Sequence, residues 1–274
     1  MTITVPGVYD MTEDDYHAHP ALSSTGARKL LSPSCPALFH HDRENGSEHK
    51  REFDLGHAAH MLVLGAGPEI HVVDAGNYQT KAAREDRDAA YTRGEIPLLP
   101  AEFDTVQAMA GKLRQHPRAA ELFAPDGVAE QSLFWVDAET GVQCRARLDY
   151  LTTNRIVDYK TTTSANPGHI AKAVDNFGYH QQDDWYRTGA IELDLVAPDA
   201  AFTFVFQSKT PPYLVTAVEL DDTALKIGYE RNRLALQIFR DCTETGVWPA
   251  YSDGIEVISL PAYAERRHHE GILL

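Results

Sequence analysis

The sequence predicts a mixed α/β protein in which helices cover a small sheet, and three observations carry this prediction. An amphipathic helical pattern over 103–123 is followed by three strand-like runs, at 131–136, 142–151 and 155–161. A helical run over 179–195 leads to two further strands, at 201–207 and 214–220. A long helix over 221–244, capped by Asp221 or Asp222, closes the series. Helix, three strands, helix, two strands, helix is an order typical of one sheet with helices packed on it.

The first 125 residues are predicted to be mainly helical. Residues 1–20 form an irregular arm, and Leu22-Ser23-Ser24-Thr25 offers a cap for a helix that Ser32-Pro33 ends. The sequence also predicts a short helix and a polar loop in 34–50, a helix over 53–64 that Gly65 stops, and a mobile loop or solvated helix within 76–100. In the second half, 137–141 reads as a hairpin turn, and 164–176 as a loop with about one helical turn.

Length and composition narrow the class of protein. The chain has 274 residues, with 25 Lys and Arg against 40 Asp and Glu, a net charge of −15. This balance argues against a protein that coats nucleic acid non-specifically, although a local basic surface is still possible. We expect one domain over 1–274, with 1–125 as a mainly helical elaboration and 126–250 as the core that carries the chemistry.

Targeting signals and cysteine usage favour the cytoplasm. No run approaches the roughly 18 apolar residues of a membrane helix, and the N-terminus lacks the basic and apolar regions of a signal peptide. Cys35, Cys144 and Cys242 are odd in number and far apart, so they predict neither a disulfide framework nor a Cys-x-x-Cys metal site.

The segment RLDYLTTNRIVDYK, residues 147–160, is the most informative for chemistry. Asp149 lies near the end of one predicted strand, and Asp158 and Lys160 project from one face of the next. Two carboxylates and the Tyr159 carbonyl are hard oxygen ligands suited to Mg²⁺ or Mn²⁺, and a neighbouring lysine can hold a water or stabilise charge on a phosphate. The alternative is a simple ion pair of Asp158 with Lys160 on an exposed strand.

Three weaker signals accompany this segment. Glu130 opens the first strand of the hairpin, and Gly56 precedes His60 by four residues on one helix face, where the glycine would let another element approach. Gln182 and Tyr186 repeat the four-residue spacing on a later helix. A buried core histidine is the alternative for His60, and the edge of an amphipathic helix is the alternative for the last pair.

Taken in order, these motifs resemble the PD-(D/E)XK nuclease superfamily in its RecB-like branch. The wider context is most similar to the RecE-type recombination exonucleases, the exonuclease VIII group of phage and prophage. The matching stretches, LSSTGARKLLSPSCPALF, FDLGHAAHMLVL, EQSLFWVDAETGVQCRARLDYL, IVDYKTTTSANPGHIAKAV and YHQQDDWYRTGA, run from about residue 22 to 190. The resemblance implies a restriction-endonuclease-like core with an N-terminal helical elaboration.

The resemblance also implies roles for single residues. His60, Asp149 and Asp158 would bind metal together with the Tyr159 carbonyl, Lys160 would be the catalytic lysine, and Glu130 would hold a second metal ion or a water. Gln182 and Tyr186 would shape the site or touch DNA. Iron–sulfur members of the branch use four cysteines, which this chain lacks, so Mg²⁺ or Mn²⁺ is the expected cofactor and no cluster is expected.

The implied activity is metal-dependent digestion of linear double-stranded DNA from 5′ ends. It would leave 3′ single strands for recombination by a single-strand annealing protein, and the enzyme would be a ring-forming homo-oligomer. Basic residues on the inner wall would meet DNA; the candidates are Arg28, Lys29, Lys50, Arg51, Lys81, Arg84 and Arg87. Two alternatives stay open: a repair or restriction-type endonuclease of the same superfamily, and a catalytically silent DNA-binding module.

Overall fold

A mixed sheet forms the centre of the molecule. The computed structural model describes residues 3, 5–46, 51–123 and 126–272. Among these, seven strands join in one sheet: β1 (Gly7–Tyr9), β2 (Leu22–Ser23), β5 (Val128–Val136), β6 (Gln143–Leu151), β7 (Arg155–Thr162), β8 (Ala201–Ser208) and β9 (Val215–Val218). The order is β1-β5-β6-β7-β8-β9, with β2 beside β6, and only β2–β6 and β7–β8 are parallel. The predicted small mixed sheet flanked by helices is confirmed.

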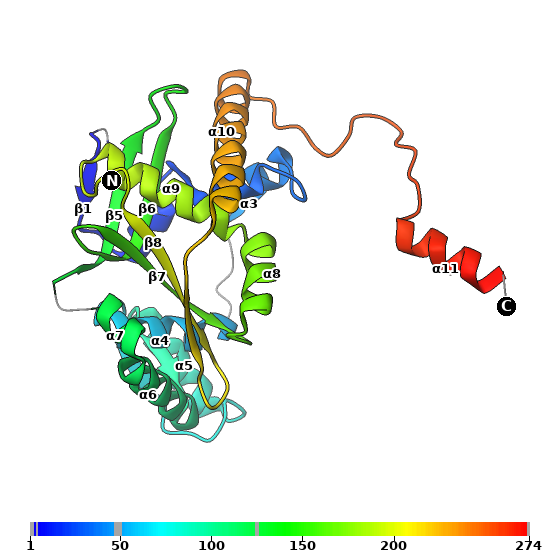
Figure 1. Cartoon of the computed structure of the whole chain (residues 1–274). Helices are drawn as coiled ribbons and strands as arrows, with labels where there is room; N and C mark the ends of the chain where they lie inside the picture. The colour runs from blue at the N-terminus through cyan, green and yellow to red at the C-terminus, as the bar shows by residue number, and fades with distance from the viewer. Residues whose placement is uncertain (1–2, 4, 47–50, 124–125, 273–274) are drawn as a thin grey trace.

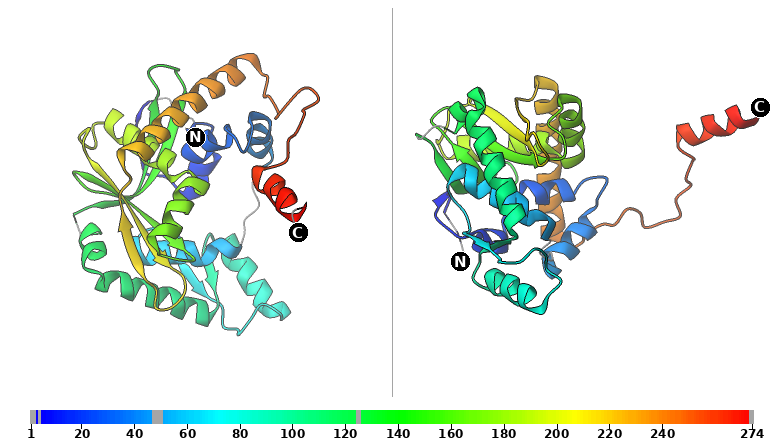
Figure 2. Two further views of the ribbon diagram at one scale, coloured as in Figure 1. Left: turned by 45° about the vertical axis from the view of Figure 1, so that its right-hand side comes forward. Right: turned by 90° about the horizontal axis from the view of Figure 1, so that it is seen from below.

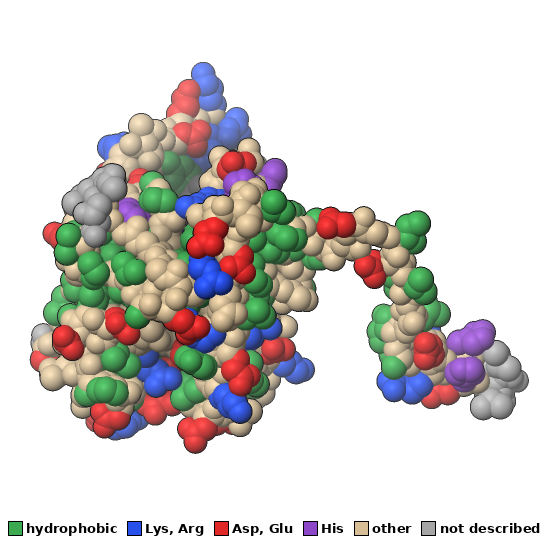
Figure 3. Space-filling model, turned by 90° about the horizontal axis from the view of Figure 1, so that it is seen from above, with side chains coloured by type: hydrophobic (Ala, Val, Ile, Leu, Met, Phe, Trp, Pro, Cys, Tyr) green, Lys and Arg blue, Asp and Glu red, His purple; other side chains and the backbone are tan. Residues whose placement is uncertain are grey.

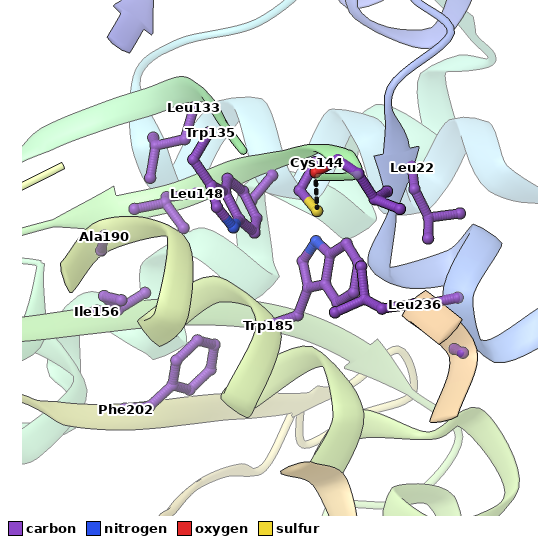
Figure 4. Close-up of a cluster of buried hydrophobic side chains, with 14 of the residues drawn as sticks. Leu22, Leu133, Trp135, Cys144, Leu148, Ile156, Trp185, Ala190, Phe202 and Leu236 are labelled. Atoms are coloured by element: carbon purple, nitrogen blue, oxygen red, sulfur yellow. Dashed lines mark hydrogen bonds between the residues drawn. The ribbon is translucent and has the colours of Figure 1, made fainter. Parts of the chain in front are cut away.

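Helices cover both faces of the sheet (Figures 1 and 2). One face carries α2 (Ser24–Lys29), α3 (Pro36–Asn45), α9 (Tyr179–Glu192) and α10 (Asp222–Thr245), and the other carries α4 (Asp54–Leu64), α6 (Pro100–Gln115) and α7 (Pro117–Leu122). Alternation along β7 explains this, because successive side chains point to opposite faces of the sheet. Ile156 packs in the core beneath α2, α3, α9 and α10, which we call the first core. Val157 and Tyr159 pack in the core beneath α4, α6 and α7, which we call the second core. Figure 4 shows the first core, where the Trp135 and Trp185 rings meet edge to face with centroids 5.7 Å apart.

Residues 76–100, expected to be a mobile loop or a solvated helix, contain a helix and a strand. Thr80 caps α5 (Lys81–Thr92) by accepting from the amide of Ala83, and the helix buries Ala83 and Ala90. Beyond it, β4 (Ile96–Leu98) pairs in parallel with β3 (Ile70–Val72) as a separate two-stranded sheet. This strand has three residues and includes a proline, which is why periodicity did not reveal it.

The N-terminal arm is more regular than expected. Strand β1 pairs with β5, and α1 (Glu13–Ala18) begins at Thr12, whose side chain accepts from the amide of Asp15. Ile3, Tyr16 and Phe134 form a third small core under the arm. The arm is therefore packed onto the sheet beside β5 and β6.

The expectation of a loop with one helical turn over 164–176 was wrong. Helix α8 (Pro167–Phe177) has eleven residues and buries Ile170 and Ala173. Its boundaries carry ordinary signals: Asn166 accepts from the amide of Gly168, Pro167 takes the first turn, and Gly178 ends the helix with φ 64°. Ile170, Ala173 and Val174 also follow helical spacing, so the segment carries both the capping and the periodic signals of a helix.

The C-terminal residues lead away from the body of the molecule. Helix α10 ends at Gly246, and an extended segment then reaches α11 (Ala262–Ile272), which stands apart in Figures 1 and 3. Within the described part of the chain, no helix combines the length and the apolar character needed to cross a membrane.

Close packing of α10 on α9 gives a test of the fold. A Cβ atom at Gly228 would overlap the backbone carbonyl of His180, which a flexible side chain cannot relieve. Gly228→Ala should therefore lower the free energy of unfolding by about 1–3 kcal/mol. The matched control is Gly111→Ala in α6, where a Cβ meets nothing within 4 Å and helix propensity favours alanine by up to about 1 kcal/mol. Equal denaturation midpoints for the two variants would contradict this packing.

Candidate active site

Three carboxylates lie in one row across the sheet. The register pairs Ala129 with Tyr150 and Gln131 with Leu148, so Glu130 of β5 faces Asp149 of β6. On the other side Tyr150 pairs with Val157, so the next position places Asp149 opposite Asp158 of β7. Neither facing pair belongs to the ladder itself. The row thus coincides with a break in the backbone pairing on both sides of β6.

Strands β6 and β7 separate at this row. Their ladder ends with Tyr150 and Val157, and the Asp149 side chain takes its place by accepting the Tyr159 amide at 2.8 Å. Because the N–H and C=O of a strand residue project to the same side, the Tyr159 carbonyl faces the same gap. Strand β6 also turns here, since Leu148 packs in the first core and Tyr150, two residues later, in the second.

Glu130 occupies an unusual backbone position in this row. Its φ of 55° is left-handed, which is uncommon for a residue other than glycine and removes it from the ladder. Arg147 fixes the carboxylate, with Nε 2.5 Å from Glu130 Oε2. The same guanidinium donates to Ser132 Oγ at 2.7 Å and to the Met11 carbonyl at 3.2 Å. Sequence reasoning missed Arg147, although it shares a strand face with Asp149.

His60 of α4 joins two of the carboxylates. Its Nε2 lies 2.9 Å from Asp149 Oδ2, and its Nδ1 lies 3.2 Å from Glu130 Oε1. Burial alone would lower the pKa of His60, but the two carboxylates raise it to about 10. The imidazolium therefore donates from both nitrogens in the absence of metal. Another element does approach Gly56, as expected: a Cβ atom there would meet Thr161 Oγ1 of β7 at 3.4 Å, a distance that still admits a small side chain.

Asp158 is the deepest group of the site. Its side chain is 1% exposed, the Lys160 ammonium lies 2.6 Å from Oδ2, and Gln182 Nε2 donates to Oδ1 at 2.6 Å. Burial, followed by the charge of Asp149, raises the pKa of Asp158 to about 7. The ammonium is near but poorly oriented, so Asp158 Oδ2 accepts no hydrogen bond.

Two further groups hold this arrangement from behind. The Tyr159 hydroxyl donates to Gln207 Oε1 at 2.7 Å, and Gln207 Nε2 donates to the Met109 carbonyl at 2.8 Å. Gln207 is fully buried and was not singled out by the sequence. Tyr186 packs on Phe202 with ring centroids 6.2 Å apart, and its burial raises the pKa of its hydroxyl.

A cavity of about 680 Å³ opens beside the row, between the start of α4, the end of β7 and α8. Its described lining carries cationic and titratable nitrogen groups, namely Lys160, Lys172, Lys209, His57, His60 and His169, and no described lining residue is Asp or Glu. His60 and Lys160 are paired with carboxylates of the row, so Lys172 and Lys209 supply the positive charge that is left over in this lining. Helix α8, which the sequence did not predict, brings His169 and Lys172 into this cavity.

Most basic candidates lie elsewhere. Arg28 donates to the Phe177 carbonyl and packs on Gly178, and Arg84 donates to the Gln79 carbonyl at 2.7 Å. Lys81 is exposed and lies 3.4 Å from Glu85. None of these three residues lines the cavity, and Lys50 lies outside the described residues. Their contact with DNA stays a prediction.

The donor set of the row fits a hard divalent cation. Asp149, Asp158 and the Tyr159 carbonyl supply oxygen atoms around one gap, and the buried Asp158 Oδ2 makes an ion pair with Lys160 but no regular hydrogen bond. Within the described ranges, no three His, Cys, Asp or Glu side chains already surround a single point as a metal site would. Hydrogens of His60, Lys160 and Gln182 satisfy the carboxylates instead, so metal binding would exchange these contacts and release a proton from His60.

The sheet, its helices and the carboxylate row define a PDDEXK-like nuclease fold, as expected. Residues 23–261 match the family described as PDDEXK-like domain of unknown function (DUF3799), and the chain belongs to that family. No curated protein sequence matches the chain. Family membership supports a nuclease, whereas a specifically RecE-type identity remains a matter of resemblance.

A solved structure resembles this one over nearly its whole length. A protein from Eubacterium rectale, named "Putative exonuclease", shares 12% identity with a TM-score of 0.63, over 94% of this chain and 98% of that one. At this identity the likeness shows the fold alone. A second structure, SSO0001, is 13% identical with a TM-score of 0.27, over 67% of this chain and 85% of that one.

The contacts of His60 allow a test of its role. If His60 is a metal ligand, its loss should weaken metal affinity. His60→Ala should therefore raise the Mn²⁺ concentration for half-maximal binding by about tenfold or more. His71→Ala is the matched control, because His71 is 29% exposed against 25% for His60 and also faces two carboxylates, Asp86 at 3.0 Å and Glu95 at 3.8 Å. A His60 variant that melts earlier but binds Mn²⁺ normally would mark a structural histidine.

Proposed function

We propose that the protein is a metal-dependent exodeoxyribonuclease acting on linear double-stranded DNA. The observation that carries the proposal is the row of Glu130, Asp149 and Asp158, with Lys160 beside it, at the edge of a cationic cavity. A phosphodiester presents a negative charge, which Lys160, Lys172 and Lys209 match. The catalytic core is assigned to 126–250, with 1–125 as its elaboration.

A bound Mg²⁺ or Mn²⁺ would polarise the scissile phosphate and acidify a water molecule. Asp149, Asp158 and the Tyr159 carbonyl would hold it, with His60 as a nitrogen ligand. Lys160, held 2.6 Å from Asp158, is placed to orient the attacking water or to neutralise charge that develops on the phosphate. Arg147 keeps Glu130 in place, where that carboxylate can hold a second ion or a water.

Finer features of the proposal rest on the resemblance to RecE-type enzymes. These are digestion from 5′ to 3′, release of 3′ single strands to an annealing protein, and a ring of several copies around DNA. An acidic exterior is compatible with such a ring, because basic residues are needed only where DNA passes. Gln182 and Tyr186 would then shape the site from behind Asp158.

Two other functions compete with this proposal. An endonuclease of repair or restriction type would use the same row, and it differs in accepting DNA without ends. A silent DNA-binding module would have no reason to retain Asp149, Asp158 and Lys160 in mutual contact range, and the paired geometry of these three residues speaks against it.

Substitutions of Asp158 and Lys160 test the assignment of these residues to catalysis. Asp158→Asn and Lys160→Met should each lower the rate of DNA hydrolysis by at least about a hundredfold, because each removes a charge from the reacting centre. Lys226→Met is the control, since Lys226 forms a comparable but exposed ion pair with Glu230 at 3.8 Å. Near-normal hydrolysis by a folded Asp158 or Lys160 variant would remove these residues from the mechanism.

Substrate form separates the exonuclease from its rivals. Linear duplex labelled separately at its 5′ and 3′ ends should be shortened in the presence of Mg²⁺, with the 5′ label released first. Covalently closed circular duplex of the same sequence should stay intact, because it offers no end. Efficient nicking of the circles would favour the endonuclease, and absence of any hydrolysis would favour the silent module.

A further inference from the structure

We propose that the cavity receives one unpaired strand, whose bases stack on Phe53 and Phe177. This inference rests on the proposed nuclease function and goes beyond it by naming the form of DNA that reaches the catalytic row. The partner strand must therefore separate before the terminal nucleotides enter.

Two exposed aromatic side chains on different elements line the cavity. Phe53 precedes α4 and Phe177 ends α8, and each is 54% exposed. Each also has an aromatic neighbour that lines the cavity: His57 lies 6.5 Å from Phe53, and Tyr179 lies 5.7 Å from Phe177, between ring centroids. Exposed phenylalanines have no role in the core, whereas base stacking on aromatic rings is a general mode of single-strand binding.

Charge identifies the occupant as a nucleic acid rather than an apolar ligand. Lys172 and Lys209 line the same space as Lys160, whose ammonium is paired with Asp158, and no described lining residue is acidic. Rings for bases and cations for phosphates are the two components of a groove for single strands. The chemistry is that of a short oligonucleotide.

Depth and size indicate one strand rather than two. The catalytic groups are deep, since Asp158 is 1% and Lys160 is 22% exposed. A cavity of about 680 Å³ has the volume of a small-molecule site, which suits one or two nucleotides of a single strand. Within a duplex, both faces of an internal base are covered by neighbours, so stacking on a protein ring requires the base to leave the helix.

The test combines binding with cleavage. Phe53→Leu and Phe177→Leu keep apolar volume and remove the ring, and Tyr229→Leu is the matched control, because Tyr229 is also 54% exposed but does not line the cavity. A single-stranded oligonucleotide with terminal 2-aminopurine is titrated with each protein in EDTA at fixed salt. Wild type and Tyr229→Leu should quench the fluorescence, and each phenylalanine variant should bind about tenfold more weakly with reduced quenching.

Cleavage is then compared on blunt linear duplex and on the same duplex with three unpaired terminal nucleotides. Wild type should prefer the unpaired end, and the phenylalanine variants should lose that preference while melting at the wild-type temperature. Equal rates on both substrates, with phenylalanine variants that quench like Tyr229→Leu, would overturn the inference and leave the nuclease proposal standing. Absence of cleavage by wild type would overturn the nuclease proposal, while the quenching data would still decide whether a strand stacks in the cavity.

Discussion

The split between β6 and β7 is the constraint on which the site depends. A sheet that continued its ladder past Tyr150 and Val157 would bond the Tyr159 amide and carbonyl to backbone groups of β6. Because the strands part, the Asp149 carboxylate takes the amide, and the carbonyl is left facing the gap. The left-handed conformation of Glu130 breaks the neighbouring ladder at the same level. Three carboxylates thus face one another where a regular sheet would have placed backbone hydrogen bonds.

Burying several carboxylates in one row is unfavourable unless each has a compensating partner. Arg147 compensates Glu130, His60 lies between Glu130 and Asp149, and Lys160 approaches Asp158. Compensation is incomplete at Asp158, whose pKa is raised by burial and then by Asp149, and whose Oδ2 accepts no hydrogen bond. Such residual repulsion favours a divalent cation, which would coordinate the oxygens of neighbouring carboxylates at once.

Strand alternation and motif order predicted the part of the site that lies on the sheet. Asp149 and Asp158 followed from the apolar pattern of their strands, and the order of strands and helices in 126–250 was predicted correctly except for α8. Helix α8 was missed although its signals were present, since Asn166 and Gly178 mark its ends and Ile170, Ala173 and Val174 follow helical spacing. Gln207 and Arg147 carried no local signal, because their importance arises from partners 98 and 136 residues away, the carbonyls of Met109 and Met11.

Those long-range partners show that the site is a property of the whole fold. Strands β5 to β7 contribute the carboxylates, but α4, which precedes all of them in the chain, supplies His60. Arg147 bonds at once to Glu130 and to the Met11 carbonyl of the arm, so the arm helps to hold the orientation of this carboxylate. Gln207 links Tyr159 to α6 in the same manner. A fragment limited to the sheet and its following helices would retain Asp149, Asp158 and Lys160, yet lack the groups that hold the row in register.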